Sequence, residues 1–254
     1  SSLILVLAFI LGNCISALFL LSKLNGIPSF KNFLYSRKFF FLSRKYKDYP
    51  FFSSFGSLAD SISLNLPILY VAYFHSLEIA GSFAIAYRII NIPIAFIGQA
   101  ISQVFYRNTI DLEDRKNIFK TTLALFSILM LIFLPFLSFI LFLGEPFLNF
   151  IFGQDWILVG QIVDFIILAG FARFCISPLS SILLSPVNLR MGVGWQILYL
   201  VTLTSTFLFL MDSDFNKFLL FFTLHEVILY IIYFLFILKG ANNLKKSSLG
   251  EKTI

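Results

Sequence analysis

The sequence of 254 residues has few of the residues on which soluble enzymes depend. Charged residues make up 13% of it, whereas hydrophobic residues make up 59%. A soluble domain needs more polar surface than this to cover its core. The two cysteines, Cys14 and Cys175, lie far apart within apolar segments, so neither a disulfide nor a cysteine metal site is predicted.

Motifs of catalysis are also missing. The sequence has no HExxH zinc motif and no glycine-rich phosphate loop, and its two histidines, His75 and His225, are far apart. The segment Asp212-Ser213-Asp214 resembles the metal-binding acid pair of a nucleotide-sugar transferase. It falls on the predicted outer side of the membrane, where nucleotide sugars are not expected. We therefore predict no catalytic site, no metal and no cofactor.

Long apolar runs dominate what the sequence does contain. Runs of about 18 or more residues are typical of membrane-spanning helices, and the period-two alternation of a β-barrel is not visible. The predicted fold class is an all-α, polytopic membrane protein of about seven transmembrane helices. The predicted spans are 3–22, 52–74, 79–106, 119–143, 157–184, 192–211 and 217–238.

The formal net charge of +6 has a clear distribution. Lys217 is predicted on one side of the membrane, Arg88 and Arg173 fall within spans, and every other Lys and Arg falls on the opposite side. By the positive-inside rule, the basic loop 23–51 and the C-terminus are cytoplasmic, and the N-terminal end of the segment faces outward. Membrane topology thus explains the basic balance without nucleic acid. The aromatic residues of the loop fit an interfacial segment or helix ends equally well.

Ionisable side chains inside the spans are the main candidates for function. Each costs at least a few kcal/mol to place in a bilayer, so it is usually paired or functional. Arg88 lies about 15 Å from its predicted helix start, close to mid-depth. Asp164 and Arg173 are nine residues apart and therefore on opposite faces of one helix, so they must meet other helices or water. The candidates are Asp60, Arg88, Asp164, Arg173, His225 and Glu226.

Two readings of these groups stay open. One is structural pairing between helices, for example of Asp60 with Arg88 in the neighbouring span. The other is contact with a substrate or a coupling ion. Gln99 and Gln103 lie four residues apart on one helix face, where their amides can bond across to a neighbouring helix.

A series of segments resembles one family over most of residues 46–184. The segments are Tyr46-Lys47-Asp48-Tyr49-Pro50-Phe51-Phe52-Ser53, Leu66-Pro67, Gly81, Ala86-Tyr87-Arg88, Pro93, Ile97-Gly98-Gln99-Ala100-Ile101-Ser102-Gln103-Val104-Phe105, Phe152-Gly153-Gln154-Asp155-Trp156, Gly160 and Phe174-Cys175-Ile176-Ser177-Pro178-Leu179-Ser180. In this order they resemble the polysaccharide transporter family of the MOP superfamily, of the O-antigen flippase type.

The resemblance implies two six-helix bundles that face each other across a cavity. Residues 1–22 would carry the last helix of the N-terminal bundle, 23–51 the inter-bundle loop, 52–238 the C-terminal bundle and 239–254 a cytoplasmic tail. The remaining helices of the first bundle would belong to a longer chain, without which this segment is not expected to transport.

The implied function is to flip an undecaprenyl-pyrophosphate-linked oligosaccharide across the inner membrane by alternating access. The implied partners are this lipid-linked oligosaccharide, the bilayer, the missing N-terminal bundle and other polysaccharide assembly proteins. Arg88 and Arg173, with Gln99 and Gln103, would bind substrate, because guanidinium groups suit diphosphates. The candidates for ion coupling are Glu226, Asp60 and Asp164. The alternatives are a cation-coupled exporter of small molecules, a membrane-embedded transferase and an assembly partner.

Overall fold

The computed structural model describes residues 2–23, 40–42, 44, 48–110, 116–153 and 156–250. Every regular element within these ranges is a helix, and no strand occurs in them. The chain divides into two units, Ser1–Asp48 and Tyr49–Ile254. The all-α prediction is confirmed for the part of the chain that the structure describes.

The first unit contains helix α1, Ser2–Lys23. This helix covers the first predicted span, and its apolar stretch, Ile10–Leu20, is shorter than the spans of the second unit. Most of the predicted basic loop 23–51 lies outside the described residues.

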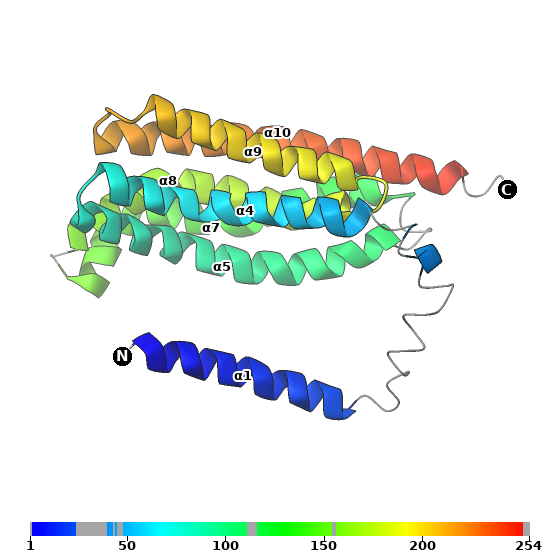
Figure 1. Cartoon of the computed structure of the whole chain (residues 1–254). Coiled ribbons are helices and arrows are strands. Elements are labelled where there is room, and N and C mark those ends of the chain that lie inside the picture. The colour runs from blue at the N-terminus through cyan, green and yellow to red at the C-terminus, as the bar shows by residue number, and fades with distance from the viewer. Residues whose placement is uncertain are drawn as a thin grey trace. The chain divides into compact units, whose positions relative to one another are not determined.

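The second unit is a bundle of long helices that run alongside one another (Figure 1). Six of its described segments are long and apolar enough to cross a membrane, and they match the last six predicted spans closely. The sequence therefore encodes a multi-pass membrane protein. The elements are α4 (Asp48–Phe74), α5 (Leu77–Ile110), α7 (Ile118–Phe152), α8 (Ile157–Ile176), the 3-10 helix η2 (Ser177–Leu184), α9 (Leu189–Phe209) and α10 (Phe215–Gly250).

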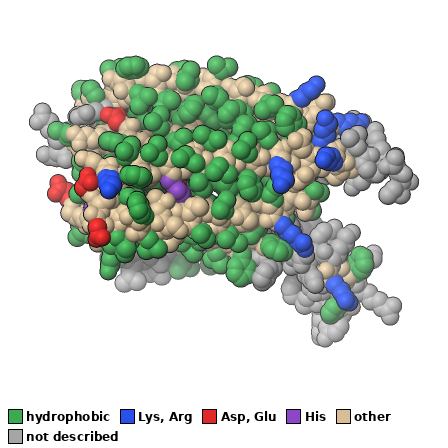
Figure 2. All heavy atoms as spheres, turned by 90° about the horizontal axis from the view of Figure 1, so that it is seen from above, with side chains coloured by type: hydrophobic (Ala, Val, Ile, Leu, Met, Phe, Trp, Pro, Cys, Tyr) green, Lys and Arg blue, Asp and Glu red, His purple; other side chains and the backbone are tan. Residues whose placement is uncertain are grey.

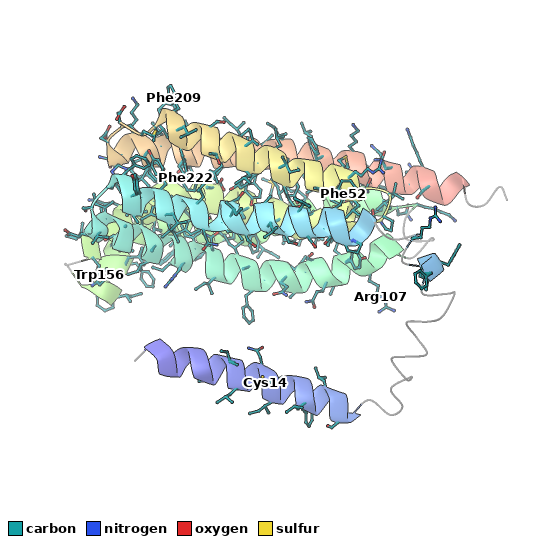
Figure 3. All side chains as sticks on the ribbon, viewed as in Figure 1. Cys14, Phe52, Arg107, Trp156, Phe209 and Phe222 are labelled. Carbon is teal, nitrogen blue, oxygen red and sulfur yellow. The ribbon has the colours of Figure 1, made fainter. Side chains whose placement is uncertain are left out.

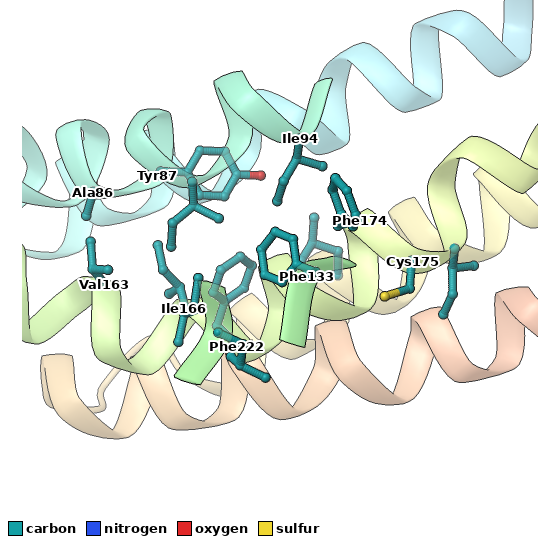
Figure 4. Close-up of a cluster of buried hydrophobic side chains, with 14 of the residues drawn as sticks. Ala86, Tyr87, Ile94, Phe133, Val163, Ile166, Phe174, Cys175 and Phe222 are labelled. Atoms are coloured by element: carbon teal, nitrogen blue, oxygen red, sulfur yellow. The ribbon is translucent and has the colours of Figure 1, made fainter. Parts of the chain in front are cut away.

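Helix α8 is the centre of the bundle, with α5, α7 and α10 packed around it. Apart from Gln161, Asp164 and Arg173, it carries apolar or small residues on every side, as expected for a helix that packs against several others. Val163 of α8 lies opposite Ala86 of α5, and Ile166 of α8 lies between α5 and Phe222 of α10 (Figure 4). Gly170 allows α5 to come close, because a Cβ there would lie 2.5 Å from Ile90 Cγ2. The absence of a side chain at Gly170 thus permits the short distance between α5 and α8.

The change from α8 to η2 has a local cause. Pro178 stands at the start of η2, directly after the last residues of α8. Its ring removes a backbone donor and crowds the preceding turn, which disfavours continuation of an α-helix. The span continues instead as a tighter 3-10 helix. Pro67, Pro93 and Pro135 lie inside α4, α5 and α7 without ending them.

The two ends of the bundle carry opposite charge. On the face shown in Figure 2, hydrophobic side chains cover the middle, Lys and Arg gather at one end, and Asp and Glu gather at the other. The end of α5, the start of α7, the start of α9 and the end of α10 supply the basic end, with Arg107, Lys116, Lys120, Arg190, Lys239, Lys245 and Lys246. The opposite helix ends carry Glu78, Asp212 and Asp214, together with Lys217. Which end faces the cytoplasm stays a prediction.

Candidate functional site

The interior of the bundle contains an ion pair between α8 and α10. Arg173 Nη2 donates to Glu226 Oε2 over 2.6 Å. The Arg173 residue is 8% exposed and Glu226 is fully buried. An ion pair at such a position loses hydration on both sides, so it persists only where further hydrogen bonds satisfy the charges.

Polar side chains of two other helices provide those bonds. Arg173 Nη1 donates to Asn91 Oδ1 at 2.6 Å and to Tyr87 Oη at 3.1 Å, both on α5. The hydroxyl of Tyr199 on α9 donates to Glu226 Oε1. The guanidinium also lies over the rings of Tyr87 and Tyr230, 5.7 and 5.6 Å from their centroids. We call this set of Tyr87, Asn91, Arg173, Tyr199 and Glu226 the buried network.

The buried network joins four helices: α5, α8, α9 and α10. Its acid and its base neutralise each other, and each has further partners. His225 extends the network, with Nδ1 3.7 Å from Glu226 Oε1 and Nε2 within 3.2 Å of Thr202 Oγ1 on α9. A network of this kind holds helices at fixed positions. The sequence predicted Arg173 and Glu226 as separate sites, and the structure brings them together.

Beside the buried network lies a polar cavity of about 160 Å³. Arg173 and Tyr199 line one part of it, and Asp60 of α4 lines another. Hydroxyl and amide groups supply most of the remaining polar lining. The lining is therefore polar enough to bind a small polar molecule or ion. Its lining is completed by Leu64, Ser177, Ser180, Trp195, Gln196, Tyr230 and Tyr233. We call it the bundle cavity.

A second polar feature lies on the exposed face of α5. Arg88, Gln99 and Gln103 are all exposed. Helical steps of 100° place Gln99 about 20° and Gln103 about 60° from Arg88 around the helix axis. The three therefore share one side of α5 over roughly 22 Å at 1.5 Å per residue. The exposed Ile92 lies on the same side between Arg88 and Gln99, so the polar groups are spaced along it rather than continuous. We call the three polar residues the α5 polar stripe. Buried neighbours such as Ala86 and Ile90 fix its direction by packing into the core.

The structure separates Arg88 from Asp60. No ion pair joins them among the described residues: Asp60 is exposed and lines the bundle cavity, whereas Arg88 is exposed on α5 and does not line it. The pairing considered from the sequence is therefore not formed. Asp164 stands apart from both features: it lines a separate recess with Gln161 and Asn216. Its Oδ1 would lie 2.9 Å from a Cβ at Gly144 of α7.

Sequence reasoning missed three members of the buried network. Tyr87 directly precedes Arg88, and Asn91 and Tyr199 are polar groups inside apolar spans. Their polarity within apolar spans could have indicated them. Tyrosine and asparagine cost less in a membrane than a charged residue, so they are a weaker indication of a functional site. Within the ranges that the structure describes, no cluster of His, Cys, Asp and Glu could hold a metal ion.

Comparison with known proteins identifies a family and a relative. The family described as "Polysaccharide biosynthesis protein" matches residues 5–160. The Teichuronic acid biosynthesis protein TuaB of Bacillus subtilis (strain 168) is 24% identical over 169 residues, which cover 62% of this chain. The matched region covers 34% of that relative, so the chain spans about a third of its length. No solved structure matches the chain.

The family match includes the α5 polar stripe, the two α5 members of the buried network and Asp60 of the bundle cavity. Arg173 and Glu226 lie beyond it. It covers more than half of the chain and agrees with the family that the residues resemble. The chain belongs to the polysaccharide biosynthesis protein family.

Proposed function

We propose that this chain takes part in moving a lipid-linked oligosaccharide across the inner membrane. The observation that carries the proposal is the α5 polar stripe. Arg88 lies about 16 Å from the start of a membrane-spanning helix, at 1.5 Å per residue. A guanidinium at this depth faces the bilayer only at a cost of several kcal/mol, so it requires a polar counterpart.

The counterpart that fits best is a diphosphate with attached sugars. A guanidinium stays charged and can donate two parallel hydrogen bonds to a phosphate. Gln99 and Gln103 lie further along the same stripe and can both donate to and accept from sugar hydroxyls. A charged group followed by amides therefore matches a ligand with one charged end and a neutral polar body.

In this proposal the stripe faces a second bundle, and substrate lies between the two. Alternating access would open the space first to one leaflet and then to the other. An undecaprenyl chain would stay among the lipids while its polar part crosses along α5. The family supports this reading, because its description concerns polysaccharide biosynthesis. The name of the relative likewise refers to biosynthesis, that of teichuronic acid. The proposed protein is a transporter rather than an enzyme.

Asp60 is the better candidate for ion coupling than Glu226 or Asp164. Glu226 already has a permanent counter-charge in Arg173, at 2.6 Å. Asp60 lies in the bundle cavity among hydroxyl and amide groups, where a proton or a small cation could neutralise it. Asp60→Asn is expected to abolish the dependence of transport on the coupling gradient and to leave the protein level in the membrane unchanged. Retained gradient dependence in this variant would remove Asp60 from the proposal.

The test of the main proposal is surface polysaccharide in cells that lack the endogenous transporter and that express this bundle together with the second bundle of the proposal. Arg88→Ala should reduce surface polymer by about 100-fold, if a charge-assisted contact of roughly 3 kcal/mol is lost. Arg88→Lys should recover part of it, because the charge is kept and the bidentate geometry is lost. Lys217→Ala is the control, since Lys217 is an exposed cation away from the stripe. Full polymer levels with Arg88→Ala, at equal protein level, would contradict the proposal.

A further inference from the structure

The bundle has an apolar groove that the transport proposal does not use. It lies between α5 and α7 and has a volume of about 550 Å³. Its walls are Ala100, Ile101, Val104 and Phe105 on one side and Thr121, Ala124, Leu125 and Ile128 on the other. The groove is on a different face of α5 from the α5 polar stripe, because Val104 lies about 160° around the helix from Arg88.

The packing of the bundle explains why the groove exists. Helices α5 and α7 both pack extensively on the central α8, whereas they have little contact with each other. Two helices held apart on a third leave a channel between them. Small side chains at Ala100 and Ala124 widen it. In a bilayer an open apolar channel of this kind is filled by a hydrocarbon chain, because no water or protein group satisfies it.

The polar hydroxyl in the groove lining has its hydrogen bond within its own helix. Thr121 is the one polar residue of the lining, and its hydroxyl donates to Asn117 O at 3.2 Å, within α7 itself. The channel that remains can accept a chain without burying an unpaired hydroxyl. Seven residues separate Thr121 from Ile128, which gives a length of about 10 Å at 1.5 Å per residue.

Basic side chains stand where the groove ends. Arg107 follows Val104 by one turn on α5, and Lys120 precedes Ala124 by one turn on α7. Residues one turn apart share a helix face, so both side chains continue the walls of the groove. Both are exposed. Figure 3 shows Arg107 at the end of the bundle that also carries Phe52, opposite the end with Trp156.

We propose that this groove is a binding site for an anionic glycerophospholipid of the surrounding leaflet. One acyl chain occupies the channel between α5 and α7, and the phosphate lies between Arg107 and Lys120. Charge complementarity selects the ligand, because basic pockets between membrane helices bind anionic headgroups. A zwitterionic lipid has the same chains but brings a cation toward these two basic groups. The site is independent of what the protein transports.

The test is lipid retention by the purified protein, taken from nanodiscs of equimolar phosphatidylglycerol and phosphatidylcholine and measured by native mass spectrometry. The wild type should retain phosphatidylglycerol in preference. Arg107→Gln and Lys120→Gln should each lower the ratio of retained phosphatidylglycerol to phosphatidylcholine by about fivefold. This is the effect expected for one basic group at an anionic surface. Lys217→Gln, at the other end of the bundle, is the charge-matched control and should leave the ratio unchanged.

A second pair of variants tests the channel itself. Ala124→Phe should fill the groove and lower retention of both lipids, whereas Ala72→Phe, at an exposed alanine of α4, should not. An unchanged lipid ratio in both Arg107→Gln and Lys120→Gln would overturn the proposal, as would full retention in Ala124→Phe. Addition of undecaprenyl phosphate distinguishes an acyl chain from a polyprenyl chain as the occupant. If it displaces the phospholipid at equal concentration, the groove binds polyprenyl chains and the proposal is wrong.

Discussion

The buried network and the α5 polar stripe both place charge inside a membrane, but in opposite states. In the network, Arg173 contacts Glu226, Asn91 and Tyr87, all within 3.1 Å. In the stripe, Arg88 faces outward from the bundle. A charge whose bonds are all made inside the protein holds helices together. A charge that faces out is available to something else. We therefore propose that the network serves stability and that the stripe contacts substrate.

The difference is instructive because the two arginines looked alike in the sequence. Both lie within apolar spans, and both were predicted to bind substrate. Their surroundings separate them: Tyr87, one residue before Arg88, points into the bundle and accepts a bond from Arg173. Adjacent residues on one helix thus serve the two regions, since each step turns the side chain by about 100°.

Removal of one partner of the buried ion pair should have the largest effect on stability. Arg173→Ala leaves Glu226 as an unpaired buried charge, which is expected to destabilise the protein by about 3–5 kcal/mol. Thermal unfolding in detergent measures this. The double variant Arg173→Met/Glu226→Leu should recover most of the loss, because two apolar groups replace the pair. Equal destabilisation in the single and double variants would show that the pair itself is not what holds the helices.

The close packing around the network should give the next effect. Gly170→Ala places a Cβ 2.5 Å from Ile90 Cγ2, so α5 and α8 must separate or the side chains must shift. Overpacking of this kind costs about 1–3 kcal/mol. Gly194→Ala is the matched control, since a Cβ there has no neighbour within 4 Å. The unfolding temperature should fall only for Gly170→Ala, and a fall of the same size in both variants would count against close packing as the cause.

Loss of a single hydrogen bond in the network should cost somewhat less. Tyr199→Phe removes the hydroxyl that donates to Glu226 Oε1 and leaves a buried carboxylate oxygen with one partner fewer. The expected loss is about 1–2 kcal/mol, read from the same unfolding curves. Tyr73→Phe provides the comparison, because Tyr73 is 83% exposed. If Tyr199→Phe unfolds like the wild type, Tyr199 does not support Glu226.

The stripe should give the smallest effect on stability. Arg88→Ala and Gln99→Ala remove exposed side chains and should change the free energy of unfolding by no more than about 0.5 kcal/mol. The same variants are expected to lose surface polymer. A large fall in unfolding temperature for Arg88→Ala would remove the distinction between the two regions.

Most of the fold could be predicted from the sequence, because each membrane span is a long apolar run and the length of the run gives the bounds of the span. The spans 52–74 and 157–184 were predicted with the bounds that the structure has. The last span was predicted to end at 238, whereas α10 continues to Gly250. Asn242, Asn243 and Lys245 are too polar for a membrane window, but they do not interrupt a helix. Hydropathy marks the bilayer segment and not the helix end.

The site was less accessible to sequence reasoning. The cost of charge in a membrane identified Arg173, Glu226, Arg88 and Asp60 as candidates, but it could not say which of them meet. Arg173 and Glu226 are 53 residues apart on α8 and α10, and their contact depends on the rotation of both helices. One of the two open readings paired Asp60 with Arg88 of the neighbouring helix. That pair is not formed among the described residues, where Asp60 instead lines the bundle cavity.

The most direct measurement is the chemical accessibility of single cysteines on α5. Cys14 and Cys175 are first replaced, and then Gln99 or Ile97 is changed to Cys; both positions are exposed, about 160° apart around the helix. A small charged thiol reagent should modify Gln99→Cys, and undecaprenyl pyrophosphate should protect it, while Ile97→Cys in the lipid should react poorly. Modification of Ile97→Cys but not of Gln99→Cys would show that the stripe faces lipid, and the central claim would be wrong.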